Sequence, residues 1–386
     1  MKVFAFTPWF LPVLGGIEIL INSLAKPLRE QGIDISVVTD DMGRLPPREV
    51  IEGTPVHRLG FTNAIRSGRP GEPLKILGQL QQLLDEESPD ILHMHCVTGP
   101  SAWYVDRLLK SSRFRGRFLV TQHGVLEPID RMPVIRGLLQ RADAISAVSE
   151  AALRSAVEFS ASEKNWGVIP NGIEEVPAER IDGAPFRLLC VGRLQREKGF
   201  DLAIRALAEV RARGIDAVLT IVGEGEERQA FARLSGELGL LNFVHFLGRL
   251  DNRATRRLVG QAHLVLVPSR TREGFSLVAA EAAMAGVTAI VARVGGLPET
   301  VLDGETGIVV SPDDPIELGA AISRMLEDEG SRSRLGHCAR LRAMKEYGVA
   351  PCAARYLAFY RSQSRSSIDQ EPSNHVLSNP SQPCFA

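Results

Sequence analysis

The sequence lacks the features that mark exported, membrane-spanning and zinc-binding proteins. Its first residues do not have the layout of a signal peptide, and no uninterrupted apolar run approaches the ~18 residues that a bilayer-spanning helix needs. Its five cysteines are scattered, odd in number and without a Cys-x-x-Cys pair. We therefore expect reduced thiols, a cytoplasmic protein and no zinc site.

Charge of one sign is not in excess either. The 386 residues include 45 basic and 46 acidic side chains, a net charge of −1, which argues against a dedicated nucleic-acid-binding protein. One local exception is a basic cluster that is either a solvated face or a docking patch for anionic lipid. The second reading predicts a peripheral protein at the inner face of the membrane. The cluster consists of Arg107, Lys110, Arg113, Arg115 and Arg117.

Short apolar runs alternate with helical patterns through most of the chain, which is typical of βαβ units and a parallel sheet. The pattern starts again after Glu174–Pro185, an acidic segment with two prolines that we interpret as a linker. The predicted strands are Lys2–Thr7, Ile33–Thr39, Ile91–His95, Phe118–Gln122, Ala144–Val148 and Gly167–Ile169 before the linker, and Phe186–Val191, Val218–Val222, Phe243–Leu247, Leu264–Pro268, Thr288–Ala292 and Gly307–Val310 after it.

These patterns predict an α/β protein with two Rossmann-like, doubly wound parallel-sheet domains, residues 1–172 and 186–347. The last residues, 362–386, are rich in Ser, Gln, Asn and Pro and have few apolar side chains. Such a segment buries too little apolar surface to offset the entropy of ordering it, so we predict a disordered tail.

A glycine pair follows the first predicted strand. Gly15 and Gly16 come just before a predicted helix, Ile17–Gln31. Residues without a Cβ let a ligand approach the backbone, and the start of a helix offers free N–H groups and the positive end of the helix dipole. The pair therefore predicts either a phosphate site or a plain turn. The dinucleotide fingerprint G-x-G-x-x-G is absent.

The segment after the strand Leu264–Pro268 carries two carboxylates. Glu273 lies in a loop, and Ser276 is expected to cap the helix Ser276–Ala285, which contains Glu281. Eight residues of helix rise ~12 Å at ~1.5 Å per residue, which argues against a glycosidase pair acting on one bond. Two separated carboxylates suit an elongated ligand with paired hydroxyl groups, such as a nucleotide sugar. Glu281 taken alone is equally consistent with a solvated helix position.

Further candidates follow other predicted strands, at the carboxyl ends where open α/β sheets bind ligands. Arg193 and Lys198 come after the first strand of the second domain. They are either a solvated charged loop or a cationic pair that holds a diphosphate and stabilises its charge as it leaves. Gly223, in the run VGEGEE, would let a nucleotide approach the backbone of the second domain.

Three histidines lie near the carboxyl ends of predicted strands of the first domain. His123 follows one strand directly and is a candidate for ligand contact, although a loop histidine without a role is the alternative. His93 and His95 share one face of another strand. No third ligand at a fitting spacing completes a metal site, so we expect both in the core or at its rim.

Taken together, these residues resemble glycosyltransferase family 4, which has the GT-B fold. The resemblance implies two Rossmann-like domains facing a cleft and a last helix, 348–361, that packs back on the first domain. It also implies a retaining transfer from a nucleoside-diphosphate sugar with no metal or other cofactor. The matching stretches run from about residue 12 to 310 and are PVLGGIE, TQHG, IPNGI, VGRLQREKG, VGEGEE, FLGR, VPSRTREGFSLVAAEAAMAG, VGGLPE and DGETGIVV.

The resemblance further implies a role for each candidate residue. Arg193 and Lys198 would bind the diphosphate, and Glu273 would bind the donor hexose. Glu281 would take the ribose hydroxyls, and His123 would contact the donor sugar near the reacting carbon. The remaining residues expected to bind the donor, largely through the backbone, are Gly15, Gly16, Gly223, Gly274, Phe275, Ser276 and Leu277.

The expected function is transfer of a hexose to a hydroxyl of a glycan or lipid-linked acceptor, in the synthesis of a polysaccharide or a cell-envelope glycan. The run TQHGVLEP resembles versions in exopolysaccharide and lipopolysaccharide enzymes. The first alternative is a nucleotide-sugar epimerase of the same two-domain fold. The others are a nicotinamide oxidoreductase, whose fingerprint is missing, and a nucleotide-sugar sensor without turnover.

Overall fold

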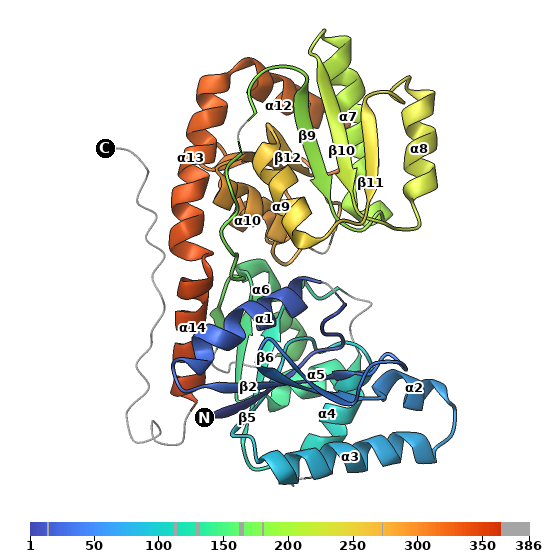
Figure 1. Ribbon diagram of the computed structural model, residues 1–386, viewed down its shortest axis with the longest axis vertical. Coiled ribbons are helices and arrows are strands. Elements are labelled where there is room, and N and C mark those ends of the chain that lie inside the picture. The colour runs from blue at the N-terminus through green and yellow to red at the C-terminus, as the bar shows by residue number, and fades with distance from the viewer. Residues whose placement is uncertain are drawn as a thin grey trace. The chain divides into compact units, whose positions relative to one another are not determined.

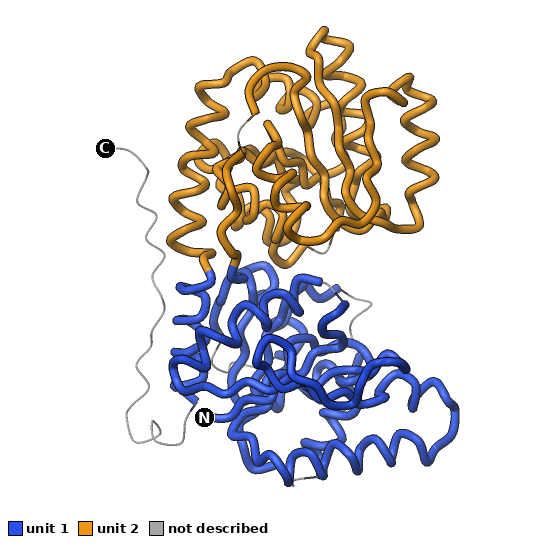
Figure 2. Tube along the Cα trace, viewed as in Figure 1, with its two compact units in different colours: residues 1–172, 349–373 blue, residues 173–348, 374–386 orange. Residues whose placement is uncertain are grey.

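The computed structural model describes residues 1–363 except 14, 112, 113, 128–131, 162–165, 180 and 272. The chain forms two compact units, which we treat separately (Figure 2). Unit 1 contains Met1–Gly172 and the helix α14 (Val349–Ser362), and unit 2 contains Ile173–Gly348. The predicted disordered tail lies outside the described residues, apart from Ser362 and Gln363.

Unit 1 is built on an eight-stranded sheet in the order β3-β4-β2-β1-β5-β6-β7-β8, in which only β3 and β4 are antiparallel. The strands are β1 (Lys2–Phe6), β2 (Asp34–Asp40), β3 (Arg48–Ile51), β4 (Thr54–Leu59), β5 (Ile91–Met94), β6 (Arg117–Gln122), β7 (Ala144–Ala147) and β8 (Trp166–Val168). The helices besides α14 are α1 (Gly16–Arg29), α2 (Phe61–Arg66), α3 (Gly71–Glu87), α4 (Pro100–Lys110), α5 (Pro133–Arg141) and α6 (Glu150–Ser160).

Helices cover both faces of this sheet (Figure 1). Val3 and Ala5 of β1 pack in the same apolar cluster as α1 and α14, whereas Phe4 and Phe6 pack with α2, α3 and α4. Successive side chains of a strand point to opposite faces, so a strand buried on both sides must be apolar throughout. That requirement is why β1 is visible as an apolar run in the sequence.

The β3–β4 hairpin is absent from the predicted strands. Its turn places Glu52 at φ +49° and Gly53 at φ +81°, both in the left-handed region. Hairpin turns of this kind favour Asn, Asp or Gly at both positions, so Glu52 hides the turn signal. β3 is also short and partly exposed along its length, and it contributes no apolar run.

Unit 2 is built on a six-stranded parallel sheet in the order β11-β10-β9-β12-β13-β14. The strands are β9 (Phe186–Val191), β10 (Ala217–Val222), β11 (Val244–Gly248), β12 (Leu264–Val267), β13 (Thr288–Ala292) and β14 (Gly307–Val310). The helices are the short η2 (Arg196–Lys198), α7 (Phe200–Ala212), α8 (Arg228–Glu237), α9 (Asn252–Gln261), α10 (Leu277–Ala285), α11 (Leu297–Thr300), α12 (Pro315–Glu327) and α13 (Glu329–Glu346).

Helices also cover both faces of the sheet of unit 2, and successive side chains of its strands pack against opposite helical layers (Figure 1). Leu188 and Cys190 of β9 pack with α7, α8 and α12, whereas Leu189 packs with α9, α10 and α13. Every predicted strand of this unit is present, with bounds that agree within a few residues. The parallel sheet of unit 2 and the largely parallel sheet of unit 1 confirm the predicted α/β, doubly wound class.

The predicted linker lacks helix and strand over its described residues but packs on α9 through its acidic side chains. Arg256 donates to Glu174, and Arg257 Nε lies 3.4 Å from Glu179 Oε1. Gln261 Nε2 donates to the other oxygen of Glu179 at 2.7 Å. The acidic composition of this segment therefore matches the basic face of the helix beneath it.

Hydrogen bonds between polar side chains cross the core of unit 1 where α14 packs on the sheet. His93 Nδ1 lies 2.8 Å from the Tyr360 hydroxyl, and its Nε2 lies 2.7 Å from Thr121 Oγ1. His95 Nδ1 lies 3.2 Å from His123 Nε2. Burial lowers the pKa of His93 and of His123 to about 3, and it also lowers the pKa of His95. All three imidazoles are therefore neutral at physiological pH, and His93 and His95 are core residues, as predicted.

We expect the stability of unit 1 to fall as the pH drops from about 7.5 to about 5.5. Below their ordinary pKa of about 6.5, the histidines take up protons in the unfolded chain but stay neutral in the folded one. His93 and His123, each with a folded pKa of about 3, then each remove roughly 1.4 kcal/mol from the free energy of unfolding by pH 5.5, and His95 acts in the same direction. Denaturant unfolding followed by tryptophan fluorescence measures this, because all three tryptophans lie in unit 1: Trp9, Trp103 and Trp166.

The variant His93→Gln should reduce the pH dependence, because it removes one titrating group and keeps hydrogen-bonding capacity. The matched control is His337→Gln, on the exposed surface of α13 in unit 2, which should leave the dependence unchanged. A wild-type unfolding free energy that stays constant across this pH range contradicts the neutral burial of the cluster.

Candidate functional site

The strand order of unit 2 reverses between β9 and β12. From β9 the chain adds β10 and β11 on one side, and then β12, β13 and β14 on the other. The two loops that leave the carboxyl ends of β9 and β12 therefore diverge, and open α/β sheets bind ligands at such a switch point. The sequence placed Arg193 and Lys198 on the first loop and Glu273 on the second.

The structure brings Lys198 and Glu273 together. Lys198 Nζ lies 2.5 Å from Glu273 Oε1, and the Ser269 hydroxyl donates to the same oxygen at 2.8 Å. The Lys198 side chain is 25% exposed and that of Glu273 is 10% exposed, so the pair is sheltered from solvent but reachable. Gly199 makes the approach possible: its φ is +66°, and a Cβ there would overlap the carbonyl oxygen of Pro268.

Arg270, which the sequence analysis did not single out, ties the two loops to each other. Its guanidinium donates to both carboxylate oxygens of Asp201 at 2.8 Å and to the Arg196 carbonyl at 2.8 Å. Burial acts to raise the pKa of Asp201, but the hydrogen bonds and charge of Arg270 outweigh it and the pKa is lowered. A bidentate pair of this kind fixes geometry as well as charge.

No signal in the sequence links these residues, because Arg270 and Asp201 are 69 positions apart. Arg193 is not drawn into the cluster. Its side chain is 71% exposed and lies 3.9 Å from Glu197, a pair that water screens strongly. Lys198 and Glu273 are thus fixed by direct contacts, whereas Arg193 is a solvated cation on the same loop.

α10 begins at Leu277, four residues after Glu273. The Ser276 side chain accepts a hydrogen bond from the N–H of Ala279, which confirms the predicted cap. The Phe275 ring packs edge-on against Tyr347, and Gly274 is buried. Over the described residues, the N–H groups of Phe275 and Leu277 have no acceptor. Two free donors and the positive end of a helix dipole therefore lie beside the Lys198–Glu273 pair.

Glu281 lies inside α10 beside Arg256 of α9. Arg256 Nε is 3.3 Å from Glu281 Oε1, and the Glu281 side chain is 17% exposed. Burial raises the pKa of Glu281, and the charge of Arg256 opposes that rise. Glu281 is therefore a sheltered, paired carboxylate and not a solvated helix position. The spacing argument needs correction, because the helix starts at Leu277 and covers only part of the interval from Glu273.

The glycines of VGEGEE have a structural explanation. Gly223 has φ +135°, and a Cβ there would overlap the carbonyl oxygen of Gly192; a Cβ at Gly225 would overlap that of Leu194. The loop after β10 therefore lies directly on the loop after β9. Close loop packing alone requires both glycines, and a donor contact at Gly223 stays a prediction.

In unit 1, the glycine pair forms the start of α1. Gly15 is the N-cap residue, with φ −150°, and Gly16 is the first helical residue. Glu18, which the sequence analysis missed, folds its carboxylate back so that a Cβ at Gly15 would overlap Glu18 Oε2. Burial raises the pKa of Glu18. A carboxylate three residues after an N-cap is the available sequence signal, since it is the capping-box position.

His123 lies just beyond β6, next to His95, which lies just beyond β5. Since β5 and β6 are neighbours in the sheet, their carboxyl ends meet at one edge. Burial keeps His123 neutral, and in the 3.2 Å contact one ring nitrogen donates its hydrogen to the other. His95 is the partner that the sequence analysis expected only in the core or at its rim.

The basic cluster is compensated locally in part. Lys110 Nζ lies 2.6 Å from Asp106, Arg117 lies 3.0 Å from Asp143, and Arg107 lies over the Trp103 ring. Arg113 is outside the described residues. Among the described helices, none combines the length and apolar character needed to cross a bilayer.

Two family descriptions together match most of the chain. Residues 14–175 match Glycosyltransferase Family 4, and residues 173–342 match Glycosyl transferases group 1. The glycogen synthase of Mycobacterium tuberculosis (strain CDC 1551 / Oshkosh) is 29% identical over 401 residues, covering 94% of this chain and 95% of that protein.

Two further proteins resemble the chain over nearly its whole length. The phosphatidyl-myo-inositol mannosyltransferase of Mycolicibacterium smegmatis (strain ATCC 700084 / mc(2)155) is 26% identical, covering 95% of both chains. A crystal structure of Anabaena HepE in complex with UDP and glucose has a TM-score of 0.77 and 21% identity, covering 94% of this chain and 100% of HepE. None of the three is named as an epimerase. The chain therefore belongs to glycosyltransferase family 4, with the GT-B fold, and is a glycosyltransferase that uses nucleoside-diphosphate sugar donors.

Proposed function

We propose that the protein is a retaining glycosyltransferase that moves a hexose from its donor to a hydroxyl of a glycan or lipid-linked acceptor. The observation that carries the proposal is the pairing of Lys198 with Glu273 at the switch point of unit 2. A cation suited to a diphosphate and a carboxylate suited to sugar hydroxyls occupy adjacent strand ends.

The names of the relatives support the choice of substrates. One relative is a glycogen synthase and another is a phosphatidylinositol mannosyltransferase, which supports a glycan or lipid-linked acceptor. The complex of HepE with UDP and glucose supports a hexose donor. We place the reaction in polysaccharide or cell-envelope glycan synthesis, in the cytoplasm, with peripheral contact to the membrane where the acceptor is lipid-linked.

In the proposed reaction, Lys198 turns from Glu273 to the diphosphate of the donor, and Arg193 adds a second cation. Glu273, still held by Ser269, accepts hydrogen bonds from hydroxyls of the hexose. Glu281 accepts hydrogen bonds from the ribose hydroxyls. For unit 1, the proposal assigns His123 to the donor sugar, as a neutral hydrogen-bonding group, and the backbone of the Gly15–Gly16 turn to the phosphate.

No side chain of the protein acts as a nucleophile in the proposed chemical step. The bond between the anomeric carbon and the diphosphate oxygen breaks, and the acceptor oxygen forms the new bond on the same face of the sugar. The departing phosphate oxygen takes the acceptor proton. Lys198 and the free N–H groups of Phe275 and Leu277 stabilise the negative charge that develops on the leaving group. No metal is needed for this step.

A panel of nucleotide sugars tests the proposal. The purified protein is incubated with UDP-glucose, UDP-galactose, UDP-N-acetylglucosamine or GDP-mannose, with and without EDTA. We expect slow release of nucleoside diphosphate from one donor, at the same rate in EDTA, and retention of anomeric configuration in the sugar product by NMR. Absence of binding to every donor, or inversion of configuration, contradicts the proposal.

Glu273→Gln and Lys198→Ala should each lower kcat/KM for sugar transfer by roughly 10²–10³-fold, because each removes a charged contact that strengthens in the transition state. Initial-rate measurements of diphosphate release give the values. The double variant should lose less than the product of the two single losses, since the two side chains act on one another as well as on the donor.

Matched controls in unit 2 are Glu305→Gln and Lys345→Ala, which change exposed residues of the same types. Both should retain wild-type rates. Near-normal transfer by Glu273→Gln and by Lys198→Ala overturns their assigned roles.

Arg256→Ala should raise KM for the donor more than it lowers kcat, and the loss should grow as the pH falls. Burial raises the pKa of Glu281, and Arg256 is the cation that opposes this. Without that charge, Glu281 takes up its proton at higher pH and can no longer accept two hydrogen bonds from the ribose diol. The measurement is KM as a function of pH.

The matched control is Arg257→Ala on the same helix, which removes an exposed arginine whose partner is Glu179. It should leave the pH dependence of KM unchanged. If the pH dependence of KM changes equally in Arg256→Ala and Arg257→Ala, the effect comes from general surface charge and not from Glu281.

A further inference from the structure

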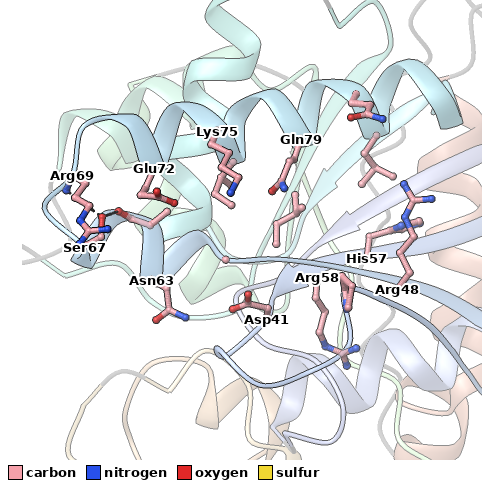
Figure 3. Close-up of a pocket in the computed structure, with 17 residues that line it drawn as sticks. Asp41, Arg48, His57, Arg58, Asn63, Ser67, Arg69, Glu72, Lys75 and Gln79 are labelled. Atoms are coloured by element: carbon pink, nitrogen blue, oxygen red, sulfur yellow. Dashed lines mark hydrogen bonds between the residues drawn. The ribbon is translucent and has the colours of Figure 1, made fainter.

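Unit 1 contains a cavity that none of the residues assigned above lines. It has a volume of about 710 Å³ and lies between β4, α2 and α3 (Figure 3). This volume falls within the ~300–1,000 Å³ of small-molecule sites. The lining residues used below are the polar Asn63, Arg69, Glu72, Lys75, Gln79 and the buried His57.

One wall of the cavity is a polar stripe along α3. Glu72, Lys75 and Gln79 recur at helical spacing on one side, and Figure 3 shows them directed from α3 into the cavity. Lys75 and Gln79 are exposed and Glu72 is half-buried, and among the described residues no hydrogen bond or ion pair holds these three side chains, so they are free to contact a ligand. With Gln82 the stripe extends over eleven residues, and the ten rises between the first and the last correspond to ~15 Å of helix. It is long enough to contact an extended ligand at several points.

The floor of the cavity contains a buried group without a partner. His57 is 7% exposed, and neither of its ring nitrogens has a hydrogen-bond partner among the described residues. Burial lowers the pKa of His57, so its ring is neutral and presents one donor and one acceptor. Its neighbour Arg58 points away from α3, toward Glu49 (Figure 3). A buried polar group that is not satisfied within the protein favours a ligand that can both donate and accept.

The chemistry of the lining selects the class of that ligand. The walls offer amides from Asn63 and Gln79, a carboxylate from Glu72 and cations from Arg69 and Lys75. Donors and acceptors are therefore mixed, which suits hydroxyl groups better than a purely anionic or purely apolar ligand. Apolar side chains that match the C–H faces of a sugar ring lie between them: Leu59, Ala64, Ile76 and Leu83.

We propose that this cavity binds a short oligosaccharide, as a subsite for sugar units of the acceptor beyond the hydroxyl that reacts. Binding of a saccharide follows from the lining alone. Its identity as the acceptor rests on the proposed function. Hydroxyl groups of the saccharide supply the partners that His57, Lys75 and Gln79 lack within the chain.

Hydrogen exchange measured by mass spectrometry tests the subsite directly. The full chain is incubated at millimolar concentration with each of four probes: maltotetraose, cellotetraose, chitotetraose and a hyaluronan tetrasaccharide. We expect at least one probe to slow exchange in α2 and α3 and to leave unit 2 unchanged. If no probe protects α2 and α3, or if protection falls only elsewhere, the subsite is overturned.

Substitutions in the lining then give the affinity for the protecting probe. Lys75→Ala, Gln79→Ala and His57→Phe should each weaken binding about three- to tenfold, the loss expected for one hydrogen bond. His57→Phe keeps the ring packing and removes both nitrogens. The matched control is Gln81→Ala, on the same helix but outside the cavity, where the amide contacts Asp85. Equal affinities of all four variants and the wild type overturn the assignment.

Tryptophan-detected unfolding verifies that each variant is folded. The donor panel described above separates this proposal from the proposed function. If nucleoside diphosphate is released but α2 and α3 are not protected, the subsite proposal is wrong and the proposed transferase function stands. If α2 and α3 are protected but no donor is turned over, the cavity binds a saccharide and its assignment as an acceptor subsite is wrong.

Discussion

The attraction between the Lys198 ammonium and the Glu273 carboxylate depends on two loops being held at one edge of one sheet. Strands β9 and β12 are hydrogen-bonded neighbours, and the loops that follow them diverge. Arg270 then fixes those loops to each other through Asp201 and the backbone. Opposite charges held at contact distance by a rigid frame need little rearrangement when a ligand of mixed charge replaces one contact. The proposed binding of the donor by unit 2 rests on this preorganisation.

In unit 1, burial favours the uncharged forms of several titratable side chains. His93, His95 and His123 are packed so that each ring stays neutral, and their hydrogen bonds run between strand ends and α14. Glu18, beside the glycine pair, has a raised pKa because it is buried. A carboxyl with a raised pKa opposes a nearby anion less than an exposed carboxylate does. The two units thus differ in their electrostatics: unit 2 holds opposite charges in contact, whereas unit 1 buries neutral imidazoles.

Much of the fold was predictable because buried parallel strands must be apolar on both faces, as β1 and β9 are. The β3–β4 hairpin was not, since Glu52 occupies a turn position where Asn or Gly would have been informative. In the site, Lys198 and Glu273 were predicted because open α/β sheets bind ligands at the carboxyl ends of their strands. Their direct contact was not predictable, because the order of strands in a sheet is set by the packing of the whole unit. Arg270 and Arg256 were missed for the same reason.

The glycines of unit 2 carry a consequence for protein engineering. Gly199 lies against the Pro268 carbonyl, Gly223 against that of Gly192, and Gly225 against that of Leu194. The loops after the neighbouring strands β10, β9 and β12 therefore meet through main-chain atoms at these three glycines, where no side chain can move to absorb a change. A chimera that imports one of these loops from a homologue inherits a mismatch with the other two. The loops after β9, β10 and β12 are a single cassette and must be transplanted as one piece.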